Sequence, residues 1–317
     1  MFRPSKIPWK YSHLNQLLAA RAMRSQSKAA QCQVVISTAD ETFYAGVPTF
    51  VYQDMNFEVT MKYAEFIDRQ LLTTEPVSLA RLQKIAERQS EQYTKLAGVL
   101  SMSQWFRSEL IGQGVPSTGI NVVGAGISSV AGNRPSHNAA KLRTRLLFVG
   151  VDFKRKGGEQ VLGAVELLRR EGGLPLTLTV VGPKKWPARG DPPPWVRFLG
   201  SVPPLKVAQL FLEHDLFVMP SHFEAYGIAL LEAQASGLPC IARRSFAMPE
   251  LVPEGWGGLL VEPNDGIGEL ANTIASALGD EMLYKNIQSR AAEVRITNSW
   301  DAVAQRVVDA IGRGLAE

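Results

Sequence analysis

Residues Met219 to Gln234 read MPSHFEAYGIALLEAQ, and this stretch indicates how the chain folds. The apolar run ahead of it, Leu216 to Met219, predicts a short buried strand that ends at Pro220. From Gly227 onward apolar residues recur at helical spacing, so a loop joins the strand to a helix that begins near Gly227. Such a helix N-terminus offers a phosphate free backbone amides and the positive end of the helix dipole, and Gly227 lets the phosphate approach closely.

Two carboxylates flank this predicted helix N-terminus. Glu224 lies in the loop, whereas Glu232 lies about 8 Å further along, within the helix. A carboxylate can accept two hydrogen bonds from a vicinal diol, so one acid suits a ribose and the other suits a second sugar. The alternative is a surface helix with two solvated acids, and this stretch alone leaves both interpretations open.

The spacing of the two acids carries a family resemblance. Glu224, seven residues and Glu232, with a tyrosine and a glycine between them, resemble the signature of the retaining family 4 glycosyltransferases, which have the GT-B fold. The resemblance implies that Glu232 binds the nucleotide ribose and that Glu224 is a catalytic residue at the donor sugar. The residues that it assigns to donor binding in this stretch are Tyr226, Gly227, Ile228, Ala229 and Glu232.

The composition describes an ordinary globular chain. Its 317 residues are 45% hydrophobic and 20% charged, which is enough for two domains. Cys32 and Cys240 lie far apart beside strand-like runs, which favours free thiols in a reducing compartment and argues against a cysteine metal site. The chain opens with no secretory signal and has no apolar run near the length that spans a bilayer. We therefore expect a cytoplasmic protein.

The positive charge is concentrated at the N-terminus. Residues 1–39 contain six basic residues and no acid, so this segment carries +6 and the rest of the +4 chain carries −2. The basic residues are Arg3, Lys6, Lys10, Arg21, Arg24 and Lys28. A helix over residues 12–23 with leucines on one side predicts peripheral contact with an anionic membrane at the inner face, or with a phosphorylated acceptor. The alternative is a solvated helix face, and no nucleic-acid-binding motif is present.

Strands and helices alternate along the first part of the chain, which indicates an α/β fold. The glycines at 124 and 126 do not form a dinucleotide fingerprint, because the third glycine of that pattern is Ser129. Residues 131–139 have linker composition, and we place the domain boundary near residue 126. The predicted elements are strands at 33–37, 48–52 and 120–123 and helices at 78–100 and 105–111.

A second α/β unit starts with the buried run LLFVG, which ends at Gly150. The loop that follows holds Lys154, Arg155 and Lys156, and two such cations can neutralise a departing diphosphate. The resemblance maps Arg155 and Lys156, ahead of Gly157, onto the catalytic cations of the family and places Gly150 at the donor site. The alternative is a solvated cationic turn. The position of the loop at the carboxyl end of a strand favours the functional interpretation.

The remaining elements continue the same pattern. Strands are predicted at 176–181, 195–199, 238–242 and 258–261, and helices at 206–213, 267–278 and 300–311. The resemblance implies a GT-B protein with two Rossmann-like domains facing a cleft. Residues 1–126 form the acceptor-side domain, residues 127–294 bind the nucleotide sugar, and residues 295–317 form a helix that crosses back to the first domain.

Two features depart from the family pattern. The family has a glycine-rich loop near the start of its first domain, whereas this chain has no glycine before Gly46, so we expect either a start that has been assigned late or a shortened first domain. Relatives place His before Asp after the second predicted strand, whereas this chain has Gln53 and Asp54. Asp54 either contacts the donor sugar or caps the following turn, and both interpretations stay open.

The residues and the resemblance together predict a metal-independent, retaining glycosyltransferase that uses a nucleotide-sugar donor, an unidentified acceptor and no cofactor. Protein cations and a helix N-terminus replace a divalent ion, and no nucleophile is evident. His214 is interpreted as structural, and His222 as either structural or part of the donor pocket. The alternatives are a non-catalytic nucleotide- or partner-binding remnant and a nucleotide-sugar epimerase or phosphorylase of the same fold.

Overall fold

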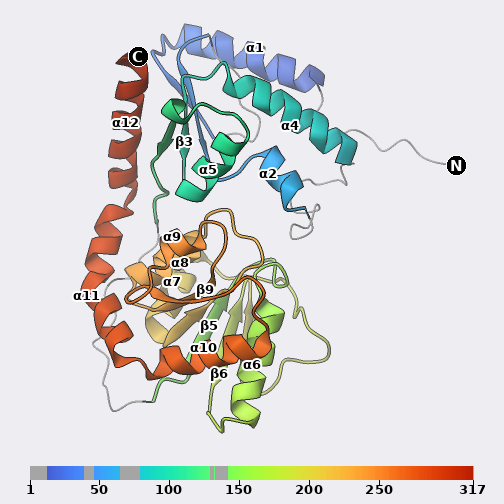
Figure 1. Cartoon of the computed structure of the whole chain (residues 1–317), viewed down its shortest axis with the longest axis vertical. Helices are drawn as coiled ribbons and strands as arrows, with labels where there is room; N and C mark the ends of the chain where they lie inside the picture. Colours follow the sequence, from blue (N-terminus) through green and yellow to red (C-terminus); the bar gives the residue numbers. More distant parts are fainter. Residues whose placement is uncertain (1–12, 39–45, 65–78, 129–131, 133–141, 317) are drawn as a thin grey trace, which may run out of the picture. The chain divides into compact units, whose positions relative to one another are not determined.

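The computed structural model describes residues 13–38, 46–64, 79–128, 132 and 142–316 (Figure 1). The chain divides into two compact units, residues 1–124 with 304–317 and residues 125–303. Each unit has a parallel β-sheet with helices packed on it, which confirms the predicted α/β class. The first three basic residues of the chain and most of the predicted linker at 131–139 lie outside the described residues.

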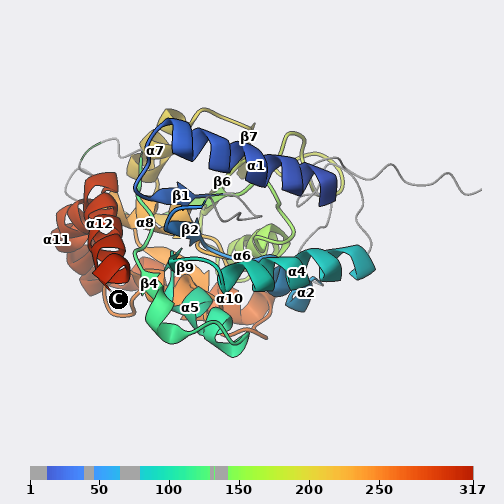
Figure 2. The same ribbon diagram turned by 90° about the horizontal axis from the view of Figure 1, so that it is seen from above.

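The described part of the first unit contains a four-stranded parallel sheet in the order β1-β2-β3-β4. Figure 2 shows α1 on one side of β1 and β2 and α4 and α5 on the other. The strands are β1 (Val35–Ser37), β2 (Thr49–Gln53), β3 (Gly98–Ser101) and β4 (Ile120–Val122). The helices are α1 (His13–Ala29), α2 (Phe57–Lys62), α4 (Leu79–Tyr93), α5 (Gln104–Gly112) and the short 3-10 turn η2 (Ser117–Gly119).

The helix predicted over residues 78–100 is wrong at its C-terminal end. The helix α4 ends at Tyr93, and the second apolar run forms the strand β3. Strand β3 is central, since it pairs with both β2 and β4, and all four of its residues are buried. A Cβ on Gly98 would lie 2.9 Å from the ring of Phe50, so the two strands approach closely there. Strand pairing on both sides of residues 98–101 therefore outweighs their helical periodicity.

The C-terminal helix is present as α12 (Trp300–Ala316). Its residues Val307, Ala310 and Ile311 pack against Phe50 and Leu100 of the first sheet. The last part of α12 therefore completes the core of the first unit.

The second unit is built on a six-stranded parallel sheet in the order β10-β9-β8-β5-β6-β7. Its strands are β5 (Arg145–Val149), β6 (Thr177–Val181), β7 (Val196–Gly200), β8 (Leu216–Val218), β9 (Cys240–Arg243) and β10 (Gly258–Val261). Strand β5 is covered on both faces, and its Leu146, Leu147 and Phe148 are fully buried. The order runs outward from β5 in both directions, so the point where it reverses lies between β5 and β8. Ligands of open α/β sheets bind beyond the carboxyl ends of the strands at such a point.

Helices cover both faces of this sheet (Figure 1). One face packs against α6 (Gly158–Arg170) and α10 (Ile267–Gly279), and the other against α7 (Pro204–Glu213), α8 (Ile228–Ala235) and α9 (Met248–Leu251). The helix α11 (Glu281–Thr297), which packs against α8, was not predicted, although Asp280 caps it by accepting a hydrogen bond from the amide of Leu283 at 2.9 Å. None of the helices in the described ranges is both long enough and apolar enough to cross a membrane.

Candidate active site

The loop between β8 and α8 ends at Gly227, the N-cap of α8. Gly227 has φ +105, a backbone conformation that only glycine adopts readily, and no side chain caps this helix end. The first amides of a helix have no partner within the helix, so those of Ile228 and Ala229 remain available to a ligand. The structure therefore has the helix N-terminus that the sequence predicts after Gly227, and phosphate binding there stays a prediction.

The basic loop after β5 lies directly against this loop. Gly157 has φ +78, and a Cβ there would lie 2.6 Å from the carbonyl oxygen of Pro220, so a glycine is required for the close approach. The approach brings Lys156 to Glu224, with 2.7 Å between Nζ and Oε2. Both side chains are half-buried, which strengthens their attraction relative to a surface pair. Gly150 makes room for this arrangement, because a Cβ there would lie 2.3 Å from Cδ of Lys156.

Arg155 joins the same cluster. Its Nε donates to Asp152 Oδ2 at 3.0 Å, and its Nη1 donates to the carbonyl oxygen of Phe223 at 2.6 Å and lies 3.9 Å from Glu224 Oε2. The backbone amide of His222 donates to the carbonyl of Arg155 at 2.7 Å. Lys154, the third cation of the predicted loop, is exposed. The structure thus unites the three residues predicted to be catalytic and leaves Lys154 at the surface.

Glu232 is the fifth residue of α8, and its carboxylate is half-buried. Burial raises the pKa of Glu232 to about 7, because desolvation disfavours the charged form. Among the residues that the structure describes, none forms a hydrogen bond or ion pair with this carboxylate. Desolvated acceptors without a partner are unfavourable in a folded protein, so the site is suited to hydrogen-bond donors from a ligand.

The two other predicted donor residues are Tyr226 and Asp54. The side chain of Tyr226 is buried, and its hydroxyl accepts a hydrogen bond from the amide of Ala125 at 3.2 Å. This hydroxyl therefore serves the fold of the second unit, and a role of Tyr226 in donor binding stays a prediction. Asp54 follows β2 in the first unit, and its role stays a prediction.

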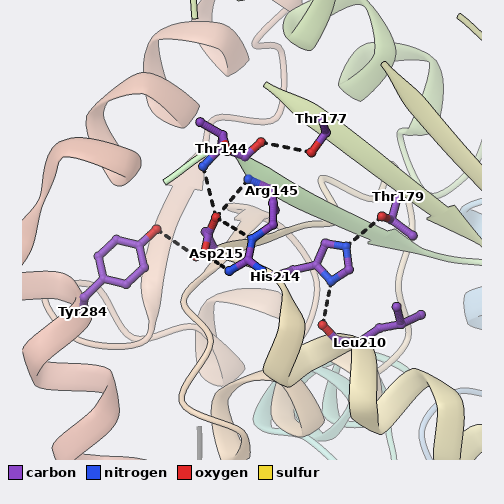
Figure 3. Close-up of polar contacts among 8 residues, drawn as sticks. All are labelled: Thr144, Arg145, Thr177, Thr179, Leu210, His214, Asp215 and Tyr284. Carbon is purple, nitrogen blue, oxygen red and sulfur yellow. Dashed lines mark hydrogen bonds and ion pairs between the residues drawn. The ribbon is translucent and has the colours of Figure 1, made fainter. Parts of the chain in front are cut away.

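His214 belongs to the framework of the second unit and not to the candidate site (Figure 3). Its Nδ1 lies 2.7 Å from the carbonyl oxygen of Leu210, and its Nε2 lies 2.7 Å from Oγ1 of Thr179. A carbonyl can only accept, so Nδ1 carries the proton and Nε2 accepts from the threonine hydroxyl. Burial lowers the pKa of His214, which keeps the ring neutral. The structural interpretation of His214 is confirmed.

Asp215 anchors the start of β5 to the start of β8 (Figure 3). Its carboxylate accepts hydrogen bonds from the amides of Thr144 and Arg145, each at 3.0 Å, and forms an ion pair with the Arg145 guanidinium at 2.9 Å. Burial alone would raise the pKa of Asp215, but the Arg145 guanidinium and the two amides outweigh it and hold the pKa below its ordinary value. The hydroxyl of Tyr284 donates to the Asp215 carbonyl at 2.8 Å. This network fixes the two strands whose opposite ends carry the candidate site.

Arg243 is a residue of the site that the sequence interpretation missed. It is buried at the carboxyl end of β9, and its guanidinium donates to the carbonyl oxygens of Pro220, Glu262 and Pro263 and to Oε1 of Gln160. These contacts hold the loop before Glu224 against two neighbouring segments. A charged residue that follows directly on a buried apolar strand is the signal that could have identified it.

Comparisons with known proteins place the chain in a family. A family model described as "Glycosyl transferases group 1" matches residues 131–294. The chain is 28% identical to O-antigen chain mannosyltransferase B of Escherichia coli over 172 residues, which cover 52% of this chain and 44% of that protein. It is 29% identical to D-inositol 3-phosphate glycosyltransferase of Corynebacterium efficiens over 212 residues, which cover 59% of this chain and 49% of that protein. The chain thus spans about half the length of these relatives.

Solved structures share the fold. Sucrose-phosphate synthase from Thermosynechococcus elongatus has a TM-score of 0.72 at 18% identity, covering 100% of this chain and 81% of that one. WaaG, a glycosyltransferase involved in lipopolysaccharide biosynthesis, has a TM-score of 0.62 at 17% identity, covering 98% and 85%. Anabaena HepE in complex with UDP-glucose has a TM-score of 0.67 at 18% identity, covering 95% and 84%. These similarities confirm the predicted GT-B fold.

Proposed function

Because the chain belongs to the group 1 glycosyl transferases, we propose that it transfers a sugar from a nucleoside-diphosphate sugar to an acceptor hydroxyl. The observation that carries the proposal is the half-buried Glu232 carboxylate, which has no partner among the described residues and lies beyond the open amides of α8. A nucleoside diphosphate fits both features, since its phosphates suit the helix N-terminus and its ribose diol suits the carboxylate.

In the ligand-free protein, Lys156 and Glu224 form an ion pair with each other. The donor binds with its sugar and its diphosphate between these two side chains. When the donor binds, Lys156 turns to the phosphate oxygens and Glu224 accepts hydroxyls of the sugar. The bond between the anomeric carbon and the phosphate oxygen breaks, and negative charge collects on the leaving diphosphate. Lys156, Arg155 and the α8 amides stabilise that charge.

We further propose that the transfer retains the configuration of the anomeric carbon and needs no divalent metal. The acceptor oxygen bonds to the anomeric carbon on the face that the phosphate leaves, and the acceptor proton passes to the leaving diphosphate. Arg155 and Lys156 supply the positive charge that a metal ion would otherwise contribute. The structure of Anabaena HepE with UDP-glucose makes UDP-glucose the first donor to test.

The acceptor class stays open. The relatives are named for O-antigen, inositol phosphate and glycogen, which differ in chemistry. Contact with an anionic membrane stays a prediction. Arg21, Arg24 and Lys28 are exposed on α1 together with Leu18, and such a basic, partly apolar face would bind vesicles with anionic lipid more tightly than neutral ones.

The testing experiment is isothermal titration of UDP-glucose into the protein in the presence of EDTA, with UDP release measured in parallel. GDP-mannose and ADP-glucose serve as alternative donors. Binding without metal, weakened about tenfold or more by Glu232→Gln, supports the proposal. Binding with no UDP release in the presence of any acceptor would favour the non-catalytic alternative. Conversion of the donor sugar without UDP release would favour the epimerase.

A further inference from the structure

The turn after β9 carries an unusual backbone conformation at Phe246. This residue has φ +56, in the left-handed region that bulky side chains rarely adopt. Such a conformation persists only where the surroundings fix it, and it is concentrated at functional sites. The turn lies at the carboxyl end of β9, which is the neighbour of β8 in the sheet, so it borders the candidate active site.

Packing fixes this turn. The ring of Phe246 meets the ring of Phe223 edge to face, with 4.9 Å between centroids and 67° between planes. The next residues along the chain, Ala247 and Met248, are fully buried. The hydroxyl of Ser245, directly before Phe246, is buried and forms no hydrogen bond within the described structure. The turn therefore holds the Phe246 ring against Phe223 although the Phe246 backbone is unfavourable and the Ser245 hydroxyl has no hydrogen bond within the described structure.

Phe223 connects the ring to the charged groups of the site. Its carbonyl oxygen accepts the Arg155 hydrogen bond at 2.6 Å, and the next residue is Glu224, which pairs with Lys156 at 2.7 Å. Phe223 is 3% exposed, so the position of its side chain is set by the residues that pack against it. Any shift of the Phe223 backbone moves the acceptor of Arg155 and the carboxylate of Glu224 together.

We propose that Phe246 is a positioning residue for glycosyl transfer. Its ring, held by the left-handed turn, fixes Phe223 and thereby sets the geometry of Glu224 with Arg155 and Lys156. This inference rests on the proposed function. It adds Phe246, which follows β9, to the residues after β5 and β8 that orient the donor sugar. A misplacement of about 1 Å at reacting groups is enough to lower turnover strongly.

The first test measures the ligand-free protein and does not depend on activity. The amide of His222, bonded to the Arg155 carbonyl at 2.7 Å, reports on the loop through its hydrogen exchange, and the amide of Val161 in α6 serves as reference. Phe246→Ala removes the ring and keeps the strained backbone, whereas Phe246→Gly removes both. We expect both variants to speed exchange at His222 about tenfold more than at Val161.

The chain offers a matched control for backbone strain. Gln31 has φ +51, is exposed and belongs to the first unit. Gln31→Gly relieves the same kind of strain in the other unit, so it should leave exchange at His222 and turnover at the parent values. Unchanged exchange in either Phe246 variant, or faster exchange in only one of them, would overturn the role of the ring.

The second test separates orientation from binding. With UDP-glucose as donor, both Phe246 variants should lower kcat for UDP release about tenfold or more and weaken UDP by clearly less than that, since Glu232 and the α8 amides are unaltered and only the Arg155 and Lys156 contacts with the diphosphate shift. Equal losses of UDP affinity and turnover would contradict a positioning role. Failure of the parent protein to use any nucleotide sugar would count against the proposed function, and exchange at His222 would still decide whether Phe246 holds the loop.

Discussion

The most informative perturbation of the donor site is a change of pH across the pKa of Glu232. Burial raises this pKa to about 7 in the ligand-free protein. The ribose hydroxyls donate hydrogen bonds, so they prefer the ionised carboxylate over the protonated acid. Well below pH 7 nearly one proton must leave Glu232 when the donor binds, whereas well above pH 7 almost none does. Donor affinity should therefore rise with pH through 7 and level off above it.

The size of the effect follows from the titration. With a pKa of about 7, the carboxylate is ionised in roughly one eleventh of the molecules at pH 6 and in roughly ten elevenths at pH 8. If the ionised form alone binds, the association constant rises about tenfold between these values, which is about 1.4 kcal/mol. Burial lowers the pKa of His222 below its ordinary value of 6.5, so the ring of His222 titrates at lower pH than the Glu232 carboxylate.

Isothermal titration calorimetry with UDP-glucose at pH 6, 7 and 8 measures this directly. UDP-glucose is preferable to UDP, because its phosphates are esterified and stay fully ionised over this range. Titrations in buffers of different ionisation enthalpy should show nearly one proton released per donor at pH 6 and almost none at pH 8. Glu232→Gln keeps the shape without the titration, so its affinity should be weaker and independent of pH. A flat profile in the parent, or the same slope in Glu232→Gln, would refute the ribose role of Glu232.

Three further substitutions test the loops around the site. Lys156→Met should lower turnover about 10²-fold or more, measured as UDP release under saturating donor, because it removes a charge from the leaving diphosphate and takes away the cation nearest to Glu224, at 2.7 Å. Arg243→Met should destabilise the protein by roughly 3–5 kcal/mol in urea unfolding, since several buried carbonyl oxygens lose their donor; a change below about 1 kcal/mol would show that water replaces the guanidinium. Gly227→Ala, which places a methyl group 3.2 Å from Cγ of Glu224 at φ +105, should weaken UDP-glucose about tenfold in the same calorimetry, and parent-like affinity would contradict the required backbone conformation.

Most secondary-structure elements of the second unit were predictable, because each has a strong local signal. The runs at β5 and β8 are short, apolar and bounded by turn residues, and α8 starts at a glycine and ends before one. The prediction failed where local signals conflicted. Residues 98–101 continue the apolar pattern of α4. They nevertheless form the strand β3, because they pair with both β2 and β4.

The candidate site was predictable where its residues lie close in sequence. The seven-residue spacing of Glu224 and Glu232 and the Lys156–Gly157 step are local motifs, and the sequence alone is enough to show their resemblance to the family. Arg243 could not be assigned in the same way. Its partners Pro220, Glu262 and Gln160 come from three separate segments, and no sequence periodicity relates them.

The sequence by itself determined the α/β class, the buried strands, the helix that begins after Gly227 and the kinds of side chain available for a donor. Only the tertiary structure decided that Lys156 reaches Glu224 across 68 positions of the chain, that the Glu232 carboxylate is half-buried, and that Phe246 is held in a left-handed turn against Phe223. The physical reason is the range of the interactions. Propensity and periodicity act over one or two helical turns, whereas strand order, burial and backbone strain are set by neighbours that meet only when β5, β8 and β9 pair.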